Sequence, residues 1–287
     1  MLAILKRELH SYFSTPAGYI FMGFFLLTAG IFFAMINLLQ ANPNYNAFLS
    51  TITFVFMLVV PVLTMRLLAE ESRQKTDQLL LTAPLSVTQI VLGKYLAALT
   101  VFAVTLLVTC LYPIILSFFG FIAVPQIIGG YLGFFLLGAC FTAIGLFISA
   151  CTENQVIAAV VSFTVLLFSW LAEMIGPGLP NSTGSGLVFL GLAVLGIAFL
   201  LYQTTKNPYL PLLAVIAGAG VMALIYGLDK TWYDGIIIRV FDWFSLYKRY
   251  NNFSQGNLSV GLLVYYLSFA AAFVFLTIQK IEKRRWS

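Results

Sequence analysis

The chain is organised around a short polar stretch, Glu70-Glu71-Ser72-Arg73-Gln74-Lys75-Thr76-Asp77-Gln78, which separates two long apolar runs, Phe48–Leu68 and Val91–Phe119. The chain has 15 Lys and Arg residues and 10 Asp and Glu residues, and five of these charged residues lie in this stretch. A helix needs about 20 predominantly apolar residues to cross a bilayer, and each run is that long. We therefore predict an all-α polytopic membrane protein in which this charged loop is an attachment point for another protein.

The composition indicates that the main solvent is membrane lipid. Hydrophobic residues make up 61% of the chain and charged residues 9%, against about 25% charged in soluble domains. A soluble core of this length could not bury so much apolar surface. The net charge is +5, but the basic residues are scattered at helix ends, so we expect no nucleic-acid partner.

Eight apolar runs are predicted to cross the membrane. Their approximate bounds are Gly18–Leu38, Phe48–Leu68, Val91–Phe119, Ile127–Ala150, Val156–Ile175, Gly186–Tyr202, Tyr209–Leu228 and Val260–Ile278. The sixth and seventh runs are joined by a short polar segment that ends in Pro208, which predicts a helical hairpin. We expect one transmembrane domain over 1–287, with a coupling loop at 69–90, a hairpin at 177–228 and an outer segment at 229–257.

The distribution of Lys and Arg predicts the orientation. With the N-terminus inside, the inner loops, tails and helix ends hold eleven of these residues and the outer side holds four. Cytoplasmic loops carry the excess of Lys and Arg, and an even number of spans returns the C-terminus to the same side. We expect a bacterial cytoplasmic (inner) membrane protein with both termini in the cytoplasm.

Two further segments are predicted to lie at the membrane surface. In the first fourteen residues, apolar side chains recur at helical spacing from Leu2 to Tyr12, with charged ones between them. A signal peptide is the alternative, but no small-residue cleavage site follows. Segment 235–250 is partly apolar, yet Arg239 and Asp242 near its centre oppose insertion by about 5–7 kcal/mol, against roughly 4–5 kcal/mol in favour. We expect one or two amphipathic helices at the outer interface there.

No catalytic or cofactor-binding pattern is found. Gly93-Lys94 lacks the remainder of a phosphate-binding loop, and no nucleophile elbow or metalloprotease helix occurs. The single His10 and the three cysteines lack the spacing of a metal site. The middle of each span is uncharged, which leaves ion-coupled transport without an ionisable site. We expect no enzyme activity, cofactor or metal in this chain, and energy must enter through the cytoplasmic loop.

The motifs around the charged loop resemble those of the type 2 ABC exporter permeases, and most closely the subgroup associated with gliding motility. The matching stretches are Glu70–Leu80 with its acidic start and paired leucines, Pro84-Leu85-Ser86, Val91–Tyr95, Gly145–Gln155, the terminal Ile281–Trp286 and Lys6–Leu9. The resemblance covers most of the chain except 177–228. Members commonly have six spans, so it implies that this hairpin is an addition.

The resemblance implies a permease that pairs with a second copy or a similar subunit, above two ABC ATPase subunits that bind ATP and Mg. An auxiliary extracytoplasmic protein is a further partner on this interpretation. A helix over Glu71–Leu80 would couple the ATPase to the permease. The predicted contacts are Glu70, Glu71, Arg73, Lys75, Thr76, Asp77, Leu79 and Leu80, with a second, smaller contact at Glu153 and Asn154.

Other interpretations of the same residues stay open. The charged loop could be solvated and serve only to set topology, and Glu153 and Asn154 could cap a helix. The alternative function, from another class, is a structural or regulatory membrane component of a surface or gliding-type machine that moves no cargo. A membrane enzyme is a third class, for which the catalytic groups are missing. The sequence does not identify the cargo.

Overall fold

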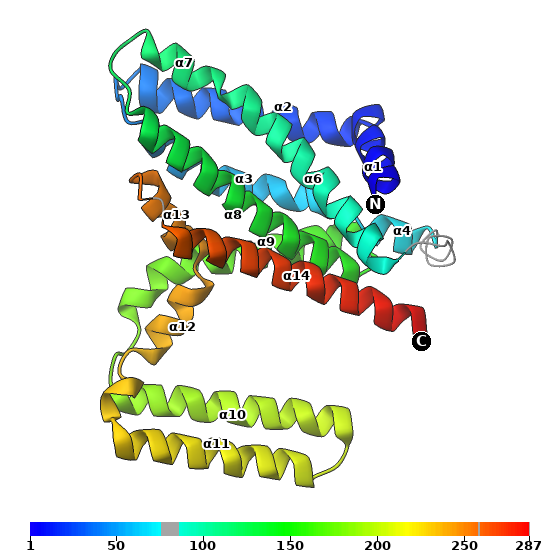
Figure 1. Cartoon of the computed structure of the whole chain (residues 1–287), viewed down its shortest axis with the longest axis vertical. Coiled ribbons are helices and arrows are strands. Elements are labelled where there is room, and N and C mark those ends of the chain that lie inside the picture. The colour runs from blue at the N-terminus through cyan, green and yellow to red at the C-terminus, as the bar shows by residue number, and fades with distance from the viewer. Residues whose placement is uncertain (76–85, 258, 287) are drawn as a thin grey trace. The chain divides into compact units, whose positions relative to one another are not determined.

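The computed structural model describes residues 1–75, 86–257 and 259–286, and within these ranges the chain forms helices and no strands (Figure 1). The α-helices are α1 (Leu2–Ser14), α2 (Pro16–Phe33), α3 (Tyr45–Thr64), α4 (Ala69–Arg73), α6 (Val87–Thr109), α7 (Leu111–Ser117), α8 (Val124–Cys151), α9 (Gln155–Ile175), α10 (Thr183–Thr205), α11 (Tyr209–Leu228), α12 (Ile236–Phe244), α13 (Leu246–Ser254) and α14 (Val260–Trp286). Three short segments of other helix types are η1 (Ala34–Leu38), η2 (Gly176–Gly178) and η3 (Lys230–Tyr233).

The eight predicted spans are confirmed. Among the described residues, eight helical segments are long and apolar enough to cross a membrane. They are Gly18–Leu38, Tyr45–Arg73, Val87–Ser117, Val124–Cys151, Gln155–Ile175, Thr183–Gln203, Tyr209–Leu228 and Val260–Arg284. Segment 235–250 instead forms parts of two short helices, α12 and α13 of nine residues each, which are too short to span.

The chain folds as two compact units. Unit 1 comprises residues 1–168 and 247–287, and unit 2 comprises residues 169–246, which include the predicted hairpin. In unit 2, α10 and α11 pack against each other, and Tyr233 donates a hydrogen bond to the carbonyl of Met222 on α11, 2.7 Å away. Most apolar side chains of α10 and α11 are exposed, as expected of helices that face lipid. The interpretation of 177–228 as an addition to the family fold stays a prediction.

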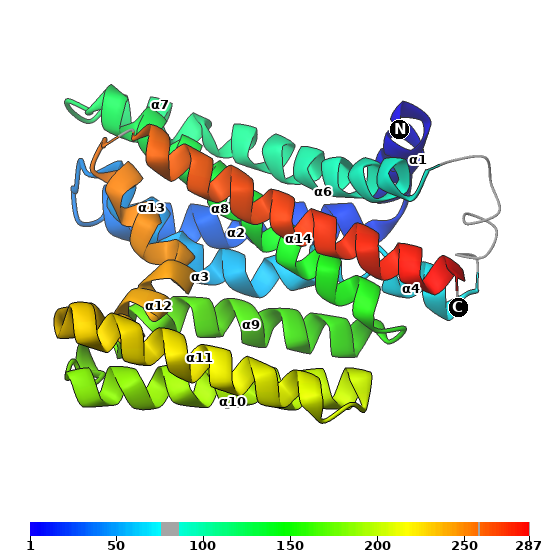
Figure 2. The same cartoon turned by 60° about the horizontal axis from the view of Figure 1, so that its bottom comes forward.

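In unit 1, α8 is the central helix, and α3, α6 and α14 pack against it (Figure 2). Glycines of α8 allow the close approach of its neighbours. A Cβ atom on Gly138 would overlap the Phe102 ring on α6, and one on Gly145 would overlap the Thr64 hydroxyl on α3. Small residues at such contacts are typical of membrane helices, whose backbones pack closely.

The N-terminal helix predicted from the first fourteen residues is confirmed as α1. It ends at Ser14, and Pro16 occupies the first turn of α2, where its missing N–H is harmless. Thr15 occupies the cap position of α2, and the Ser14 hydroxyl donates to the carbonyl of His10 at 2.5 Å. Both views place α1, α4 and the two termini at the same end of unit 1 (Figures 1 and 2).

Candidate functional site

The candidate site is the α4 junction, which we define as α4 together with the side chains that hold it: Arg7, Glu8, Glu71, Ser72, Lys94, Ser149, Glu153 and Arg284. It begins where α3 ends. Pro61 lies in the last turn of α3, and residues 65–68 form a turn before α4 starts at Ala69. The last carbonyls of a helix and the first N–H groups of the next have no partner within the helix, so a junction of this kind needs partners from outside.

Ser149 on α8 supplies three of these hydrogen bonds. Its hydroxyl accepts from the backbone N–H groups of Leu68 and Ala69, at 3.1 and 3.0 Å, and donates to the carbonyl of Met65 at 3.1 Å. Ser149 is fully buried. A single side chain of the central helix therefore fixes both the end of α3 and the start of α4.

A second contact with the end of α3 comes from α1. The buried Tyr12 hydroxyl donates to the carbonyl of Leu63 at 3.0 Å. Further along, Ile4 of α1 packs closely on Gly93 of α6. A Cβ atom built on Gly93 would lie 2.8 Å from the side chain of Ile4. This contact brings α1 beside the residue that follows Gly93, which is Lys94.

Lys94 is the centre of a four-residue ion cluster that joins α1, α4 and α6. Its side chain is 2% exposed, and its ammonium lies 2.8 Å from the Glu71 carboxylate and 3.1 Å from the Glu8 carboxylate. Arg7 contacts the same two carboxylates, at 2.7 Å from Glu8 and 3.1 Å from Glu71. The formal charges cancel, so a buried ammonium is compensated by two carboxylates within reach.

The cluster alters the titration of its members on α1. Burial alone would raise the pKa of Glu8, but the charge of Lys94 and the hydrogen bonds from Arg7 and Lys94 outweigh it, and the pKa lies below its ordinary value. The hydrogen bond to Glu8 is the main reason that the pKa of Arg7 is raised. Glu8 and Arg7 are therefore both charged near neutral pH.

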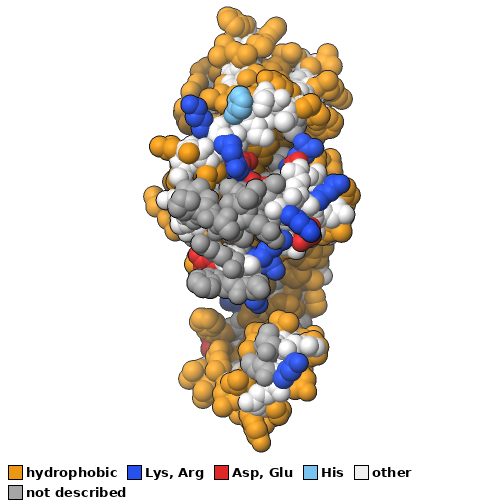
Figure 3. Space-filling view, turned by 90° about the vertical axis from the view of Figure 1, so that its right-hand side faces the viewer, with side chains coloured by type: hydrophobic (Ala, Val, Ile, Leu, Met, Phe, Trp, Pro, Cys, Tyr) orange, Lys and Arg blue, Asp and Glu red, His pale blue; other side chains and the backbone are white. Residues whose placement is uncertain are grey.

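Arg284 of α14 makes the third contact with α4. Its guanidinium donates to the hydroxyl of Ser72 at 2.7 Å and to the carboxylate of Glu153 at 3.1 Å. Glu153 lies in the connection between α8 and α9. The space-filling view shows that acidic and basic side chains gather on the end of unit 1 that carries these contacts, with hydrophobic side chains around them (Figure 3).

The predicted contact residues fall into four groups. Glu71 lies in the ion cluster, and Glu70 lies 3.8 Å from Arg66, so both of these predicted ATPase contacts have charged partners within the chain. Lys94 and Arg7 reach Glu71 from neighbouring helices, and Arg66 lies one helical turn before Glu70. Arg73 and Lys75 are exposed, and their contact with an ATPase stays a prediction. Thr76, Asp77, Leu79 and Leu80 lie outside the described residues.

The predicted helix over Glu71–Leu80 is not continuous. α4 ends at Arg73, and Lys75 adopts a left-handed conformation with φ of 56°. L-residues take this conformation mainly at turns and helix ends, so the described part of the segment is a helix of five residues followed by a turn.

Glu153 and Asn154 have distinct roles at the start of α9. The Asn154 side chain accepts from the backbone N–H groups of Val156 and Ile157, at 2.9 and 3.3 Å, which confirms the capping interpretation for this residue. Glu153 pairs with Arg284, and its side chain is 68% exposed. Contact of either residue with an ATPase stays a prediction.

Sequence reasoning missed Arg7, Glu8, Ser72, Lys94, Ser149 and Arg284 as parts of the site. All six lie within the motifs 6–9, 70–80, 91–95, 145–155 and 281–286. A basic residue one turn inside an apolar run was the available signal for Lys94, because a charge there needs a partner. Within the described residues, no group of three or more His, Cys, Asp or Glu could hold a metal ion.

These observations define a multi-pass membrane protein whose charged groups gather at one end of unit 1. Residues 37–189 match a family described as ABC-2 family transporter protein. The match covers more than half of the chain, and the chain belongs to this family. It includes Glu71, Lys94, Ser149 and Glu153 of the α4 junction. Among curated proteins, none matches the chain. Membership implies a membrane subunit that associates with ABC ATPase subunits.

Proposed function

We propose that this protein is the membrane-spanning permease subunit of an ATP-binding cassette exporter in a bacterial cytoplasmic membrane. Two copies, or one copy and a similar subunit, form the path for the cargo, and separate ATPase subunits bind ATP and Mg. Both termini and α4 are cytoplasmic on this proposal. The gliding-motility subgroup is part of it and rests on the combination of the motifs at 6–9, 70–80, 84–86, 91–95, 145–155 and 281–286.

The α4 junction is the observation that carries the proposal. Glu71 links α4 to α1 and α6, Ser72 links it to α14, and Ser149 of α8 holds its first residues. A force applied to α4 would therefore be transmitted to four other helices at once. Such rigid connections are what a transporter needs if an ATPase at its surface is to move helices within the membrane.

The exposed residues next to the junction are the proposed docking contacts. Arg73 and Lys75 are exposed at the end of α4, whereas Glu71 is engaged within the chain. Arg73, Lys75 and the predicted contacts Thr76, Asp77, Leu79 and Leu80 would lie against the ATPase, with Glu153 close by. Glu71 has a different part in the proposal, because it passes the displacement of α4 to α1 and α6.

The test is a double charge reversal, Arg73→Glu with Lys75→Glu, in permease reconstituted in nanodiscs with the ATPase subunit that co-purifies from host membranes. Exposed ion pairs contribute about 0–1 kcal/mol each, so loss of two should weaken ATPase binding by up to about 25-fold and lower ATP turnover. Lys206→Glu on the exposed α10–α11 turn is the control. Unchanged binding and turnover in the double variant, or ATP hydrolysis by permease free of ATPase, would contradict the proposal.

A further inference from the structure

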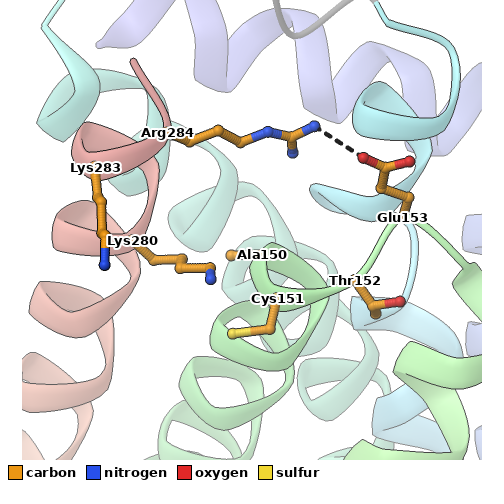
Figure 4. Close-up of a pocket in the computed structure, with 7 residues that line it drawn as sticks. All are labelled: Ala150, Cys151, Thr152, Glu153, Lys280, Lys283 and Arg284. Atoms are coloured by element: carbon orange, nitrogen blue, oxygen red, sulfur yellow. Dashed lines mark hydrogen bonds and ion pairs between the residues drawn. The ribbon is translucent and has the colours of Figure 1, made fainter. Parts of the chain in front are cut away.

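A pocket of about 290 Å³ lies in unit 1 where the end of α14 passes the end of α8. Its lining residues are Ala150, Cys151, Thr152, Glu153, Lys280, Lys283 and Arg284. Figure 4 shows Lys280 pointing from α14 toward Ala150 and Cys151, and Arg284 pointing toward Glu153. The volume is at the lower end of the roughly 300–1,000 Å³ typical of small-ligand pockets, which suits one small polar group rather than a large cargo.

The pocket carries an excess of positive charge. Three cationic side chains and one carboxylate line the pocket, and Arg284 is already bonded to Glu153 and to Ser72. In the ranges that the structure describes, Lys280 and Lys283 form no ion pair with a carboxylate. These two ammonium groups repel each other, and an anion between them would relieve the repulsion.

The position of the lysines relates the pocket to the membrane. They lie in the last turns of the candidate span Val260–Arg284, at the depth where a spanning helix meets the lipid headgroups. Leu276 precedes Lys280 by four residues and Lys283 by seven, which places the three on one side of α14. The Leu276 side chain is 45% exposed and can lie against an acyl chain.

We propose that this pocket binds the phosphate group of an anionic membrane phospholipid. Lys280 and Lys283 contact the phosphate oxygens, Arg284 borders the site, and the acyl chains run along Leu276. Soluble phosphate also offers anionic oxygen atoms but has no acyl chain, so the exposed Leu276 favours the lipid. Arg284 also bonds Ser72, so the lipid site adjoins the α4 junction. The proposal needs neither an ATPase nor transport.

Cys151 provides the test, because it lines the pocket and its side chain is exposed. Full-length protein carrying Ser14→Cys would be placed in nanodiscs of phosphatidylcholine with increasing phosphatidylglycerol and treated with a maleimide. Mass spectrometry of peptides follows the labelling rates at Cys151 and at position 14 in one sample. Position 14 is exposed on α1 at the same end of unit 1 and corrects for the effect of surface charge on thiol reactivity.

Phosphatidylglycerol should slow labelling of Cys151 relative to position 14. The variant Lys280→Gln with Lys283→Gln should need an anionic lipid fraction at least about fivefold higher for the same protection. Loss of even one basic residue near an anionic lipid surface weakens lipid binding by about this factor. Lys6→Gln with Lys206→Gln removes the same charge elsewhere and should keep the protection.

Three results would overturn the proposal. The first is equal labelling in neutral and anionic nanodiscs. The second is equal protection by inorganic phosphate added to neutral nanodiscs, which would assign the pocket to a soluble anion. The third is protection that appears only when the ATPase subunit is added, which would assign the pocket to a protein contact. An unchanged melting temperature of the double lysine variant shows that any loss of protection is not a loss of fold.

Discussion

At the scale of single residues, Lys94 has the strongest requirement for its partners. Its side chain is 2% exposed, and a buried ammonium without a counter-charge is strongly disfavoured. Replacing both charges of such a pair with apolar groups is often neutral, whereas removing one partner leaves the other buried and uncompensated. The two carboxylates, Glu8 and Glu71, would then lose the buried counter-charge and keep their contacts with the more exposed Arg7.

Lys94→Met should therefore destabilise unit 1 by about 3 kcal/mol, since loss of one member of a buried ion pair costs 3–5 kcal/mol and these carboxylates retain some exposure. Thermal melting in detergent, followed by the loss of helical circular dichroism, measures the change. Lys6→Met, an exposed lysine on α1, is the matched control and should melt like the parent protein. Combining Lys94→Met with Glu71→Gln should cost less than the sum of the two single changes. Strict additivity would contradict the cluster.

Glu8 gives the cluster a pH dependence of known sign. Its pKa in the folded protein lies below the ordinary value of 4.5, so its charge contributes stability that is present above pH 4.5 and is lost as the pH falls through the folded pKa. The melting temperature of the parent should exceed that of Glu8→Gln by a constant amount between about pH 5 and 7, and the difference should shrink on further acidification. A difference that grows below pH 4.5 would contradict the assignment.

At the scale of elements, the glycines of α8 determine how closely its neighbours pack. Gly145 faces the Thr64 hydroxyl on α3, whereas a Cβ atom on Gly196 of α10 would meet no neighbouring atom of the described residues within 4 Å. Gly145→Ala should destabilise the protein by about 1–3 kcal/mol through overpacking. Gly196→Ala should be neutral or stabilising by up to about 1 kcal/mol, because alanine is the better helix former. The comparison of their melting temperatures is the test, and equal effects would contradict the close packing of α3 and α8.

Element boundaries show what the sequence can and cannot predict. The spans follow from apolar composition and length, and the Tyr209–Leu228 span has the predicted bounds. The end of α4 at Arg73 was not predictable in this way, because it depends on partners brought by other helices: Ser149 at its start and Arg284 at Ser72. Apolar periodicity also gives no information on which lysine of a helix end is buried. Lys94 lies one turn inside the start of an apolar run and Lys280 follows the end of one, and only the packing of α1 on α6 buries the former.

At the scale of the whole molecule, the charge distribution and the fold agree on one feature. Both termini and α4 lie at the same end of unit 1, as an even number of spans requires. The side of the membrane on which that end lies rests on the eleven-to-four bias in Lys and Arg. The same bias predicts that segment 229–257, which connects α11 to α14 and carries the other four basic residues, lies on the outer side.

Labelling of single cysteines in intact cells tests this orientation. Gln255 is exposed near the end of α13, and Ser14 is exposed at the end of α1. A membrane-impermeant maleimide should label Gln255→Cys from outside and should label Ser14→Cys only after the membrane is opened, because reversing the chain would place eleven basic residues outside. Each variant is made with Cys110, Cys140 and Cys151 replaced by alanine, and labelling in opened membranes shows that both introduced thiols are reactive.

Labelling of position 14 in intact cells, with position 255 protected, would place α4 outside. An ATPase in the cytoplasm could then not reach Arg73 and Lys75, and the coupling proposed for the α4 junction would fail with the topology.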